Sequence, residues 1–271
     1  MRRMFLLLFF VLPLACGQPV EKRVATYEKA PIIVISIDTL RADRLPMFGY
    51  KKVATPHLDQ LRGDSILFRN AYTHAPLTLP AHASLLTGLL PTEHKVRNNL
   101  GYVLSGGIPT LPRMLKAKGF ATGAAVSAYV LRGTTGLGRD FDEYDDGITS
   151  RGQAVVGQIQ RAGRETSAIA KKWIDAHRSQ PFFYMLHIFE PHSPYEPEEP
   201  FRSRYRDRYD GEIATADAIV GDFLDYLRNA GLYDKAVIFL LSDHGEGLGD
   251  HGEPEHGIFI YRETIHIPLL L

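Results

Sequence analysis

Three side chains that can bind a metal ion lie at the ends of two apolar runs. Asp38 follows the run 32–37, and Asp243 and His244 follow the run 236–241. Such runs are typical of strands covered on both faces of a parallel sheet, and the carboxyl ends of these strands meet at the edge where α/β proteins place their sites. Each acid alone is equally well explained as a strand-end residue in a solvated loop. Together, two carboxylates and an imidazole predict a metal site.

Thr78 is the residue that could act as a nucleophile. Its segment 73–80 (THAPLTLP) ends on Pro80, which favours a helix over 81–87 with the threonine hydroxyl at its N-terminus. Amide donors and the helix dipole stabilise an anion there, and a divalent cation could hold the hydroxyl as an alkoxide. On local sequence alone, a simple capping hydroxyl is the alternative explanation.

Strands and helices alternate along the rest of the chain. β-branched and apolar runs predict the strands, and N-caps, first-turn prolines and following glycines predict the helices. The expected strands are 32–37, 66–68, 120–126, 182–188 and 236–241, and the expected helices are 56–61, 110–118, 153–176 and 213–227. This alternation predicts one α/β domain with a largely parallel sheet.

Composition limits the classes of partner. The 271 residues, 45% hydrophobic and 23% charged, can bury a substantial core. Lys+Arg and Asp+Glu both number 31, which removes the positive field that a nucleic-acid-binding protein would use. We therefore expect no nucleic-acid partner.

The N-terminus has the pattern of an export signal. Residues 1–16 combine two arginines with a short apolar run that ends at Cys16, the only cysteine. The run is too short to span a bilayer comfortably, and Cys16 stands where a bacterial lipoprotein carries its lipid. Lipidation of Cys16, plain signal cleavage and an uncleaved anchor are the alternatives. We expect a bacterial cell-envelope protein, periplasmic or tethered to a membrane, with a polar tether over 17–30 and a catalytic domain over 31–271.

Several segments resemble motifs of the sulfatase family in the alkaline phosphatase superfamily. Residues 78–88 (TLPAHASLLTG) resemble the signature C-x-P-S-R-A-S-L-L-T-G, and residues 37–43 (IDTLRAD) and 242–252 (SDHGEGLGDHG) resemble the two metal loops. Looser matches are 190–194 (EPHSP) and 256–263 (HGIFIYRE). The resemblance implies an alkaline phosphatase-like α/β sandwich with a largely parallel central sheet.

The resemblance also implies roles for the matched residues. The implied metal ligands are Asp38, Thr78, Asp243 and His244; the implied catalytic residues are Thr78, His82 and His192; and the implied substrate contacts are His192 and His256. Thr39 and Glu190 are doubtful additions, and His94, which could equally be a packing residue or a solvated loop contact, is left out. Thr39 stands where sulfatases usually have a second aspartate, so we expect one metal ion.

Two departures from the family pattern bear on the chemistry. Thr78 replaces the cysteine that sulfatases convert to formylglycine, and His82 replaces the signature arginine. A threonine nucleophile resembles the phosphodiesterase, phosphoglycerate mutase and phosphoethanolamine transferase branches of the superfamily, which pass through a phosphothreonine. His244 stands where calcium-binding sulfatases have asparagine, so zinc or manganese is favoured, with calcium as the alternative.

These observations predict a metal-dependent hydrolase or transferase acting on small anionic esters. A phosphodiester or phosphomonoester is favoured because the nucleophile is Thr78. The alternatives are a sulfuric ester hydrolase and, in another class, an inactive membrane-tethered anion-binding protein. Family members continue past a strand like 265–271 into a C-terminal subdomain, so we expect that subdomain to be missing from a truncated chain. The oligomeric state is not indicated.

Overall fold

The fold is that of a computed structural model, which describes residues 27–149, 156 and 159–271. The expected signal (1–16) and residues 17–26 of the expected tether lie outside these ranges. Within the described ranges, no helix combines the length and the apolar character needed to cross a membrane.

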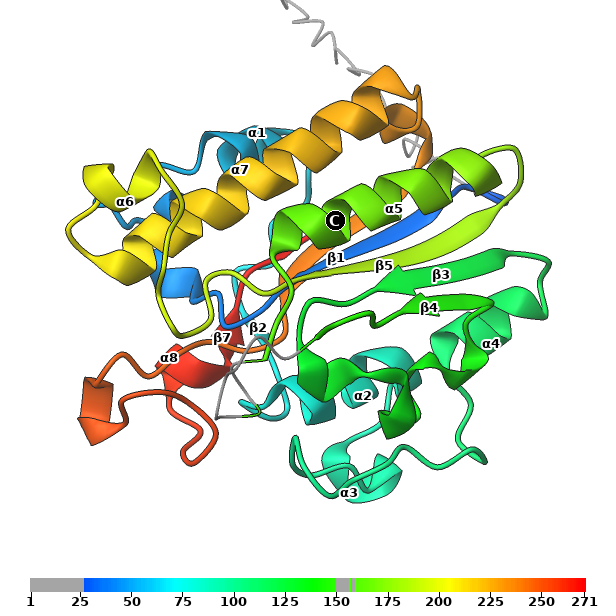
Figure 1. The fold of residues 1–271 in the computed structure, drawn as a ribbon, viewed down its shortest axis with the longest axis horizontal. Coiled ribbons are helices and arrows are strands. Elements are labelled where there is room, and N and C mark those ends of the chain that lie inside the picture. Colours follow the sequence, from blue (N-terminus) through cyan, green and yellow to red (C-terminus); the bar gives the residue numbers. More distant parts are fainter. Residues whose placement is uncertain (1–26, 150–155, 157–158) are drawn as a thin grey trace, which may run out of the picture.

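A six-stranded sheet forms the centre of the molecule, in the order β4-β3-β5-β1-β6-β8 (Figure 1). Its strands are β1 (Ile32–Ile37), β3 (Ala121–Ala125), β4 (Glu143–Asp145), β5 (Phe182–Ile188), β6 (Val237–Ser242) and β8 (Leu269–Leu270). All neighbours are parallel except β6 and β8. A separate antiparallel pair joins β2 (Ala71–Tyr72) to β7 (His266–Ile267). The predicted α/β sandwich with a largely parallel sheet is confirmed.

Strand β1 lies between β5 and β6 because it is apolar on both faces. Ile33, Ile35 and Ile37 face one core and Val34 faces the other, and all four are buried. The register sets Ile37 beside both Ile188 of β5 and Ser242 of β6. The three strands therefore end level with one another, and the residues that follow them emerge at one edge of the sheet.

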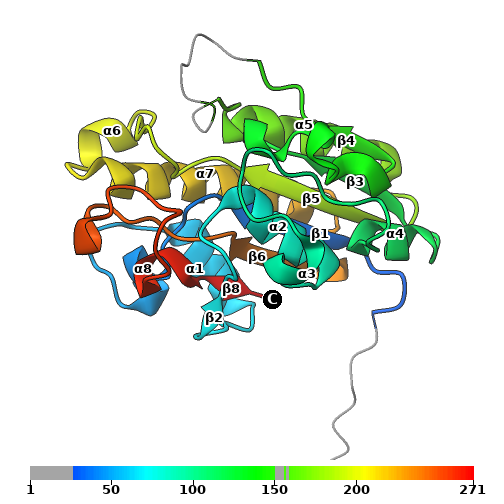
Figure 2. The same ribbon diagram turned by 90° about the horizontal axis from the view of Figure 1, so that it is seen from below.

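Helices cover both faces of this sheet (Figures 1 and 2). One face carries α1 (Pro56–Gly63), α5 (Gly163–His177) and α7 (Arg208–Asn229), and the other carries α2 (Thr78–Thr87), α3 (Pro91–His94) and α4 (Leu111–Lys116). Two short helices, α6 (Phe201–Arg204) and α8 (Arg262–Ile265), lie beyond the carboxyl end of β1 (Figure 1).

The start of α2 differs from the prediction. The helix begins at Thr78 rather than at Ala81, and the amide of Ala81 already donates to the carbonyl of Leu77. Pro80 therefore lies inside the first turn, where a missing N–H removes no intrahelical hydrogen bond. Thr78 is thus part of the helix rather than a residue that precedes it.

Two further boundaries also differ. The helix expected over 153–176 begins only at Gly163, whose amide donates to the carboxylate of Glu190 at 3.1 Å. Residues 159–162 are not helical, and 153–155, 157 and 158 lie outside the described part of the chain. The strand expected at 66–68 is reduced to an isolated bridge between Leu67 and Leu270.

Candidate metal and catalytic site

Asp38, Asp243 and His244 converge at the carboxyl edge of the sheet. The Nε2 atom of His244 lies 3.7 Å from Asp38 Oδ1 and 3.4 Å from Asp243 Oδ2. One ligand atom from each residue falls within 4.8 Å of the others, and all three residues are buried. The structure thus brings together the two loops in which the sequence places metal ligands.

Three of the four carboxylate oxygens in this cluster lack a hydrogen-bond partner in the described part of the chain. Both oxygens of Asp38 and Oδ2 of Asp243 are buried and accept no hydrogen bond there. Burial, and then the charge of Asp38, raise the pKa of Asp243 well above its usual value. An uncompensated buried carboxylate costs on the order of several kcal/mol. The donor set therefore fits one divalent cation, which would satisfy both acids at once.

The imidazole of His244 is held in the form that binds metals. Its Nδ1 lies 2.8 Å from the carbonyl oxygen of Gly245, which can only accept, so Nδ1 carries the hydrogen and Nε2 presents a lone pair to the two acids. Burial, and then the nearby His256, hold the pKa of His244 well below its usual value. A neutral imidazole is therefore expected at this position.

Thr78 borders the cluster. Its Oγ1 lies 3.3 Å from Nε2 of His244, and its side chain is buried at the first position of α2. The amide of Leu79, one of the donors expected to face an anion, is occupied by Oδ1 of Asn99 at 2.8 Å. The hydroxyl, rather than a set of free amides, is what α2 presents to the metal ligands.

His82 lies one turn along α2, behind Thr78. Its Nδ1 is 2.8 Å from the carbonyl oxygen of Thr78 and its Nε2 is 3.0 Å from Oγ of Ser36, so Nδ1 donates and Nε2 accepts. Burial, and then the nearby His187, lower the pKa of His82 to about 3. Because both ring nitrogens are used within the protein, this placement fits a residue that holds Thr78 better than one that touches a substrate.

His192 and His256 form a second row of side chains next to the cluster. The ring centroid of His256 is 4.4 Å from that of His244 and 5.2 Å from that of His192. Nδ1 of His256 lies 3.0 Å from Oε1 of the buried Glu246. Burial alone would lower the pKa of His256, but the hydrogen bond and charge of Glu246 raise it above the usual value. The raised pKa favours the protonated imidazole, whose charge would suit an anionic oxygen.

The two doubtful residues have different positions. Thr39 belongs to the site through its backbone, because its amide donates to Oδ1 of Asp243 at 3.2 Å. Its φ of 54° lies in the left-handed region, which is costly for a β-branched residue. Glu190 faces α5 instead, where its carboxylate accepts the amide of Gly163, and it lies in neither candidate ligand group of the described residues.

A clamp that the sequence analysis missed joins the two metal loops. The buried Arg41 reaches Oδ2 of Asp43 and Oδ2 of Asp250, each at 2.8 Å. Tyr209 of α7 donates to the carbonyl oxygen of Thr39 and accepts from the amide of Arg41. These contacts hold the left-handed turn at Thr39 in place, and no sequence motif indicates them.

Two more residues of the site were missed, although each left a signal. His187 is the one histidine inside the apolar strand β5, and its Nε2 lies 3.5 Å from Oδ2 of Asp38. Glu246 falls within the second metal loop, and its Oε2 also accepts from the hydroxyl of Tyr195 at 3.0 Å. A polar residue where a strand should be wholly apolar is the sign that could have identified His187.

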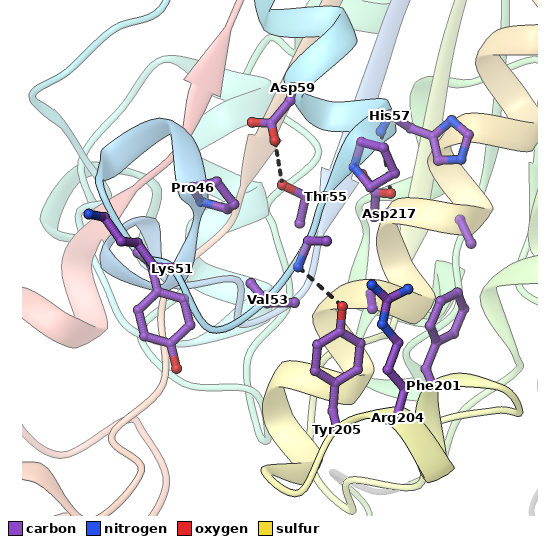
Figure 3. Close-up of a pocket in the computed structure, with 15 residues that line it drawn as sticks. Pro46, Lys51, Val53, Thr55, His57, Asp59, Phe201, Arg204, Tyr205 and Asp217 are labelled. Carbon is purple, nitrogen blue, oxygen red and sulfur yellow. Dashed lines mark hydrogen bonds between the residues drawn. The ribbon is translucent and has the colours of Figure 1, made fainter.

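Cavity size does not indicate this site. A cavity of about 620 Å³ lies between α1, α6 and α7, lined by Thr55, Phe201 and Tyr205 among others, and no residue of the metal cluster borders it (Figure 3). A much smaller cavity of about 150 Å³ reaches Asp243, beside His74. The site is therefore recognised by its unpaired carboxylates rather than by its volume.

The chain resembles curated sulfatases over much of its length. N-acetylgalactosamine-6-sulfatase of Homo sapiens is 26% identical over 83% of this chain and 51% of that protein. The arylsulfatase of Clostridium perfringens is 22% identical over 90% of this chain and 68% of that protein. The chain thus spans about half the length of the human relative.

Solved structures share the fold. A putative sulfatase from Bacteroides fragilis superposes with a TM-score of 0.74 at 23% identity, over 92% of this chain and 69% of that one. The phosphonate monoester hydrolase of Agrobacterium radiobacter superposes with a TM-score of 0.73 at 20% identity, over 89% and 67%. A family model for sulfatases matches residues 31–271. The chain therefore belongs to the sulfatase family.

Proposed function

We propose that the protein is an exported, metal-dependent hydrolase of small anionic esters in which Thr78 is the nucleophile. The observation that carries this proposal is the 3.3 Å distance between Thr78 Oγ1 and His244 Nε2, at the border of a cluster in which three of the four carboxylate oxygens lack a hydrogen bond among the described residues. Because the chain spans about half of its human relative, the activity of the whole protein is part of the proposal. The proposal also includes a signal over 1–16, a tether over 17–30 and membrane attachment through Cys16.

The proposed ligands of the metal are Asp38, Thr78, Asp243 and His244. When bound, a divalent ion would lower the pKa of the Thr78 hydroxyl and offset the negative charge of the reacting ester. The nitrogen ligand favours zinc or manganese, whereas calcium, the alternative, prefers oxygen ligands only.

In the proposed reaction Oγ1 of Thr78 attacks the central atom of the ester. A bond forms between this oxygen and phosphorus while the bond to the leaving oxygen breaks, and His192 donates the proton that the leaving oxygen needs. His256, held by Glu246, binds a non-bridging oxygen, and His82 keeps the turn at Thr78 in place. The proton of the Thr78 hydroxyl passes to solvent as its oxygen attacks. A water molecule then attacks phosphorus, returns a proton to His192 and breaks the bond to Oγ1 of Thr78, which regains a proton from solvent.

Phosphorus is the preferred centre because Thr78 cannot become formylglycine. Sulfatases attack with the hydrate of that aldehyde, and a side chain without the cysteine precursor cannot supply it. The curated relatives named above are sulfatases, so a sulfate ester remains the second candidate substrate. The fold neighbour from Agrobacterium radiobacter is a phosphonate monoester hydrolase, which supports phosphorus chemistry on this fold.

The test compares aryl phosphate monoesters, aryl phosphate diesters and aryl sulfates as substrates, with zinc, manganese or calcium added. We expect turnover of a phosphate ester, and we expect Thr78→Ala to lower it by about 10³-fold or more while the protein stays folded. Thr87→Ala is the matched control, because Thr87 lies at the other end of α2 and donates to the carbonyl of Ala83. Thr78-dependent hydrolysis of aryl sulfates alone would show that the proposed phosphate ester substrate is wrong. Metal binding without any turnover would favour an inactive anion-binding protein.

A further inference from the structure

A second group of ligand-type side chains lies beside the first. His82, His187 and Asp243 also bring one nitrogen or oxygen each within 4.8 Å of one another, and all three are buried. Asp243 belongs to both groups, so the two could share a ligand or only one could bind metal. The hydrogen positions on the two histidines decide between these alternatives.

Hydrogen bonds already occupy the nitrogens of His82. Its Nδ1 donates to the carbonyl of Thr78 and its Nε2 accepts from Ser36, so neither nitrogen has a lone pair free for a metal. A metal ligand on this ring would require both hydrogen bonds to break. The second group therefore lacks one of its three donors.

The backbone of Ser127 fixes the hydrogen on His187. The amide of Ser127 points at Nδ1 of His187 at 3.3 Å, so Nδ1 must accept and the neutral ring carries its hydrogen on Nε2. The hydroxyl of Ser127 donates to the carbonyl oxygen of His187 at 2.8 Å and contacts Oγ1 of Thr166 at 2.7 Å. This network holds the ring from the side of β3 and α5, away from the metal ligands.

The hydrogen on Nε2 faces a metal ligand. Nε2 of His187 lies 3.5 Å from Oδ2 of Asp38, and neither atom has a hydrogen-bond partner among the described residues. The two side chains come from adjacent strands, with His187 beside Ser36 and Asp38 just beyond the end of β1. Among the proposed metal ligands, the acceptor recorded within 4.0 Å of this nitrogen is one oxygen of Asp38.

We propose that His187 is a positioning residue, which orients Asp38 through its Nε2 hydrogen and leaves the other carboxylate oxygen to the metal. His187 itself is not a metal ligand, and the second group binds no ion. Outer hydrogen bonds of this kind fix the geometry of metal-binding carboxylates, and their loss typically lowers metal affinity by about 10- to 100-fold. The inference rests on the metal site of the proposed function.

Two isosteric substitutions separate the two edges of the ring. In His187→Gln the amide nitrogen takes the place of Nε2 and can still donate to Asp38, whereas in His187→Asn the amide oxygen takes the place of Nδ1 and can accept only from Ser127. We expect His187→Asn to weaken zinc or manganese binding by about 10- to 100-fold and His187→Gln to stay within about threefold of the wild type. Competition against a chelating dye measures the affinities in the full chain.

His94 supplies a matched control. It is equally buried, its Nδ1 accepts from the amide of Val96 at 3.1 Å, and its Nε2 lies 3.0 Å from Oγ of Ser84. The same pattern of hydrogen bonds thus occurs away from the metal ligands. His94→Asn and His94→Gln should destabilise the fold to a similar extent and leave metal affinity unchanged.

The outcomes distinguish the inference from the proposal on which it rests. A wild-type protein that binds no divalent metal would refute the metal site itself. Metal binding that both His187 variants retain, or that both lose equally while folded, would overturn the positioning role. As a measurement that needs no variant, long-range ¹H–¹⁵N correlation spectra should show the hydrogen of His187 on Nε2 with and without zinc. A zinc-bound Nε2 would overturn the inference.

Discussion

Buried aspartates occur in two regions of this protein with opposite surroundings. Asp217 of α7 is 2% exposed, and its oxygens accept the amides of Leu58 at 2.8 Å and His57 at 3.4 Å, so it caps the N-terminus of α1 (Figure 3). Asp38 is 0% exposed, and neither of its oxygens has a hydrogen bond among the described residues. The two aspartates are buried to a similar extent, but only Asp217 has hydrogen bonds to its carboxylate.

The comparison shows which property separates the proposed metal ligand Asp38 from a capping aspartate. Burial raises the pKa of both Asp217 and Asp243, so a shifted pKa alone does not tell a cap from a ligand. A capping carboxylate accepts hydrogen bonds from backbone amides of the protein. A ligand carboxylate keeps at least one oxygen free, at a free-energy cost that a cation offsets.

The largest predicted effect comes from substituting the two aspartates separately. Asp38→Asn removes a charge that no protein group replaces, so we expect metal affinity and turnover to fall by about 10³-fold or more. Asp217→Asn keeps an acceptor for the amide of Leu58, and we expect turnover within about twofold of the wild type. Metal titration and steady-state kinetics measure both variants, and equal losses in the two would refute the comparison.

Removal of the metal should have an intermediate effect. A ligand present at about 100 times its Kd stabilises the folded state by about 2.7 kcal/mol, so chelation should lower the free energy of unfolding by about that amount. Urea unfolding with and without EDTA measures the difference. Asp217→Asn should show the same loss, and Asp38→Asn should show almost none. If EDTA left the free energy of unfolding of the wild type unchanged, the prediction of a bound metal ion would be wrong.

The smallest predicted effect is the pH dependence of the cap. Burial raises the pKa of Asp217 to about 6, above its value of about 4 in the unfolded chain, so the folded state binds more protons between these values. Stability from this group is therefore full below about pH 4 and is lost as the pH rises through about 6. We expect the wild type to lose on the order of 1–2 kcal/mol relative to Asp217→Asn between pH 4.5 and pH 7. Parallel urea titrations measure it, and identical profiles would refute the shift.

Much of the fold can be predicted because its central strands are apolar on both faces. The prediction for 32–37 matches β1 and that for 182–188 matches β5, since a strand covered on both sides reads as one continuous run. The start of α5 could not be predicted in this way. It depends on Glu190, which caps Gly163 from another part of the chain, and no local pattern carries that contact.

The convergence of three candidate metal ligands was predictable from the sequence, and the residues that hold them in place were not. Asp38, Asp243 and His244 follow strands or stand in motifs, so their convergence follows from the topology of a parallel sheet. His187 was missed because one histidine within an apolar strand reads as a core residue. Its position beside Asp38 depends on the register between β1 and β5, and no local sequence pattern predicts that register.

The site joins β1, near the start of the described chain, to β6, near its end. Closing so long a loop is slow, and parallel pairing of distant strands forms late in folding. The metal ligands are therefore brought together only after every intervening helix has been synthesised and the last parallel strand has docked. Uptake of the proposed metal ion would therefore report the completion of folding.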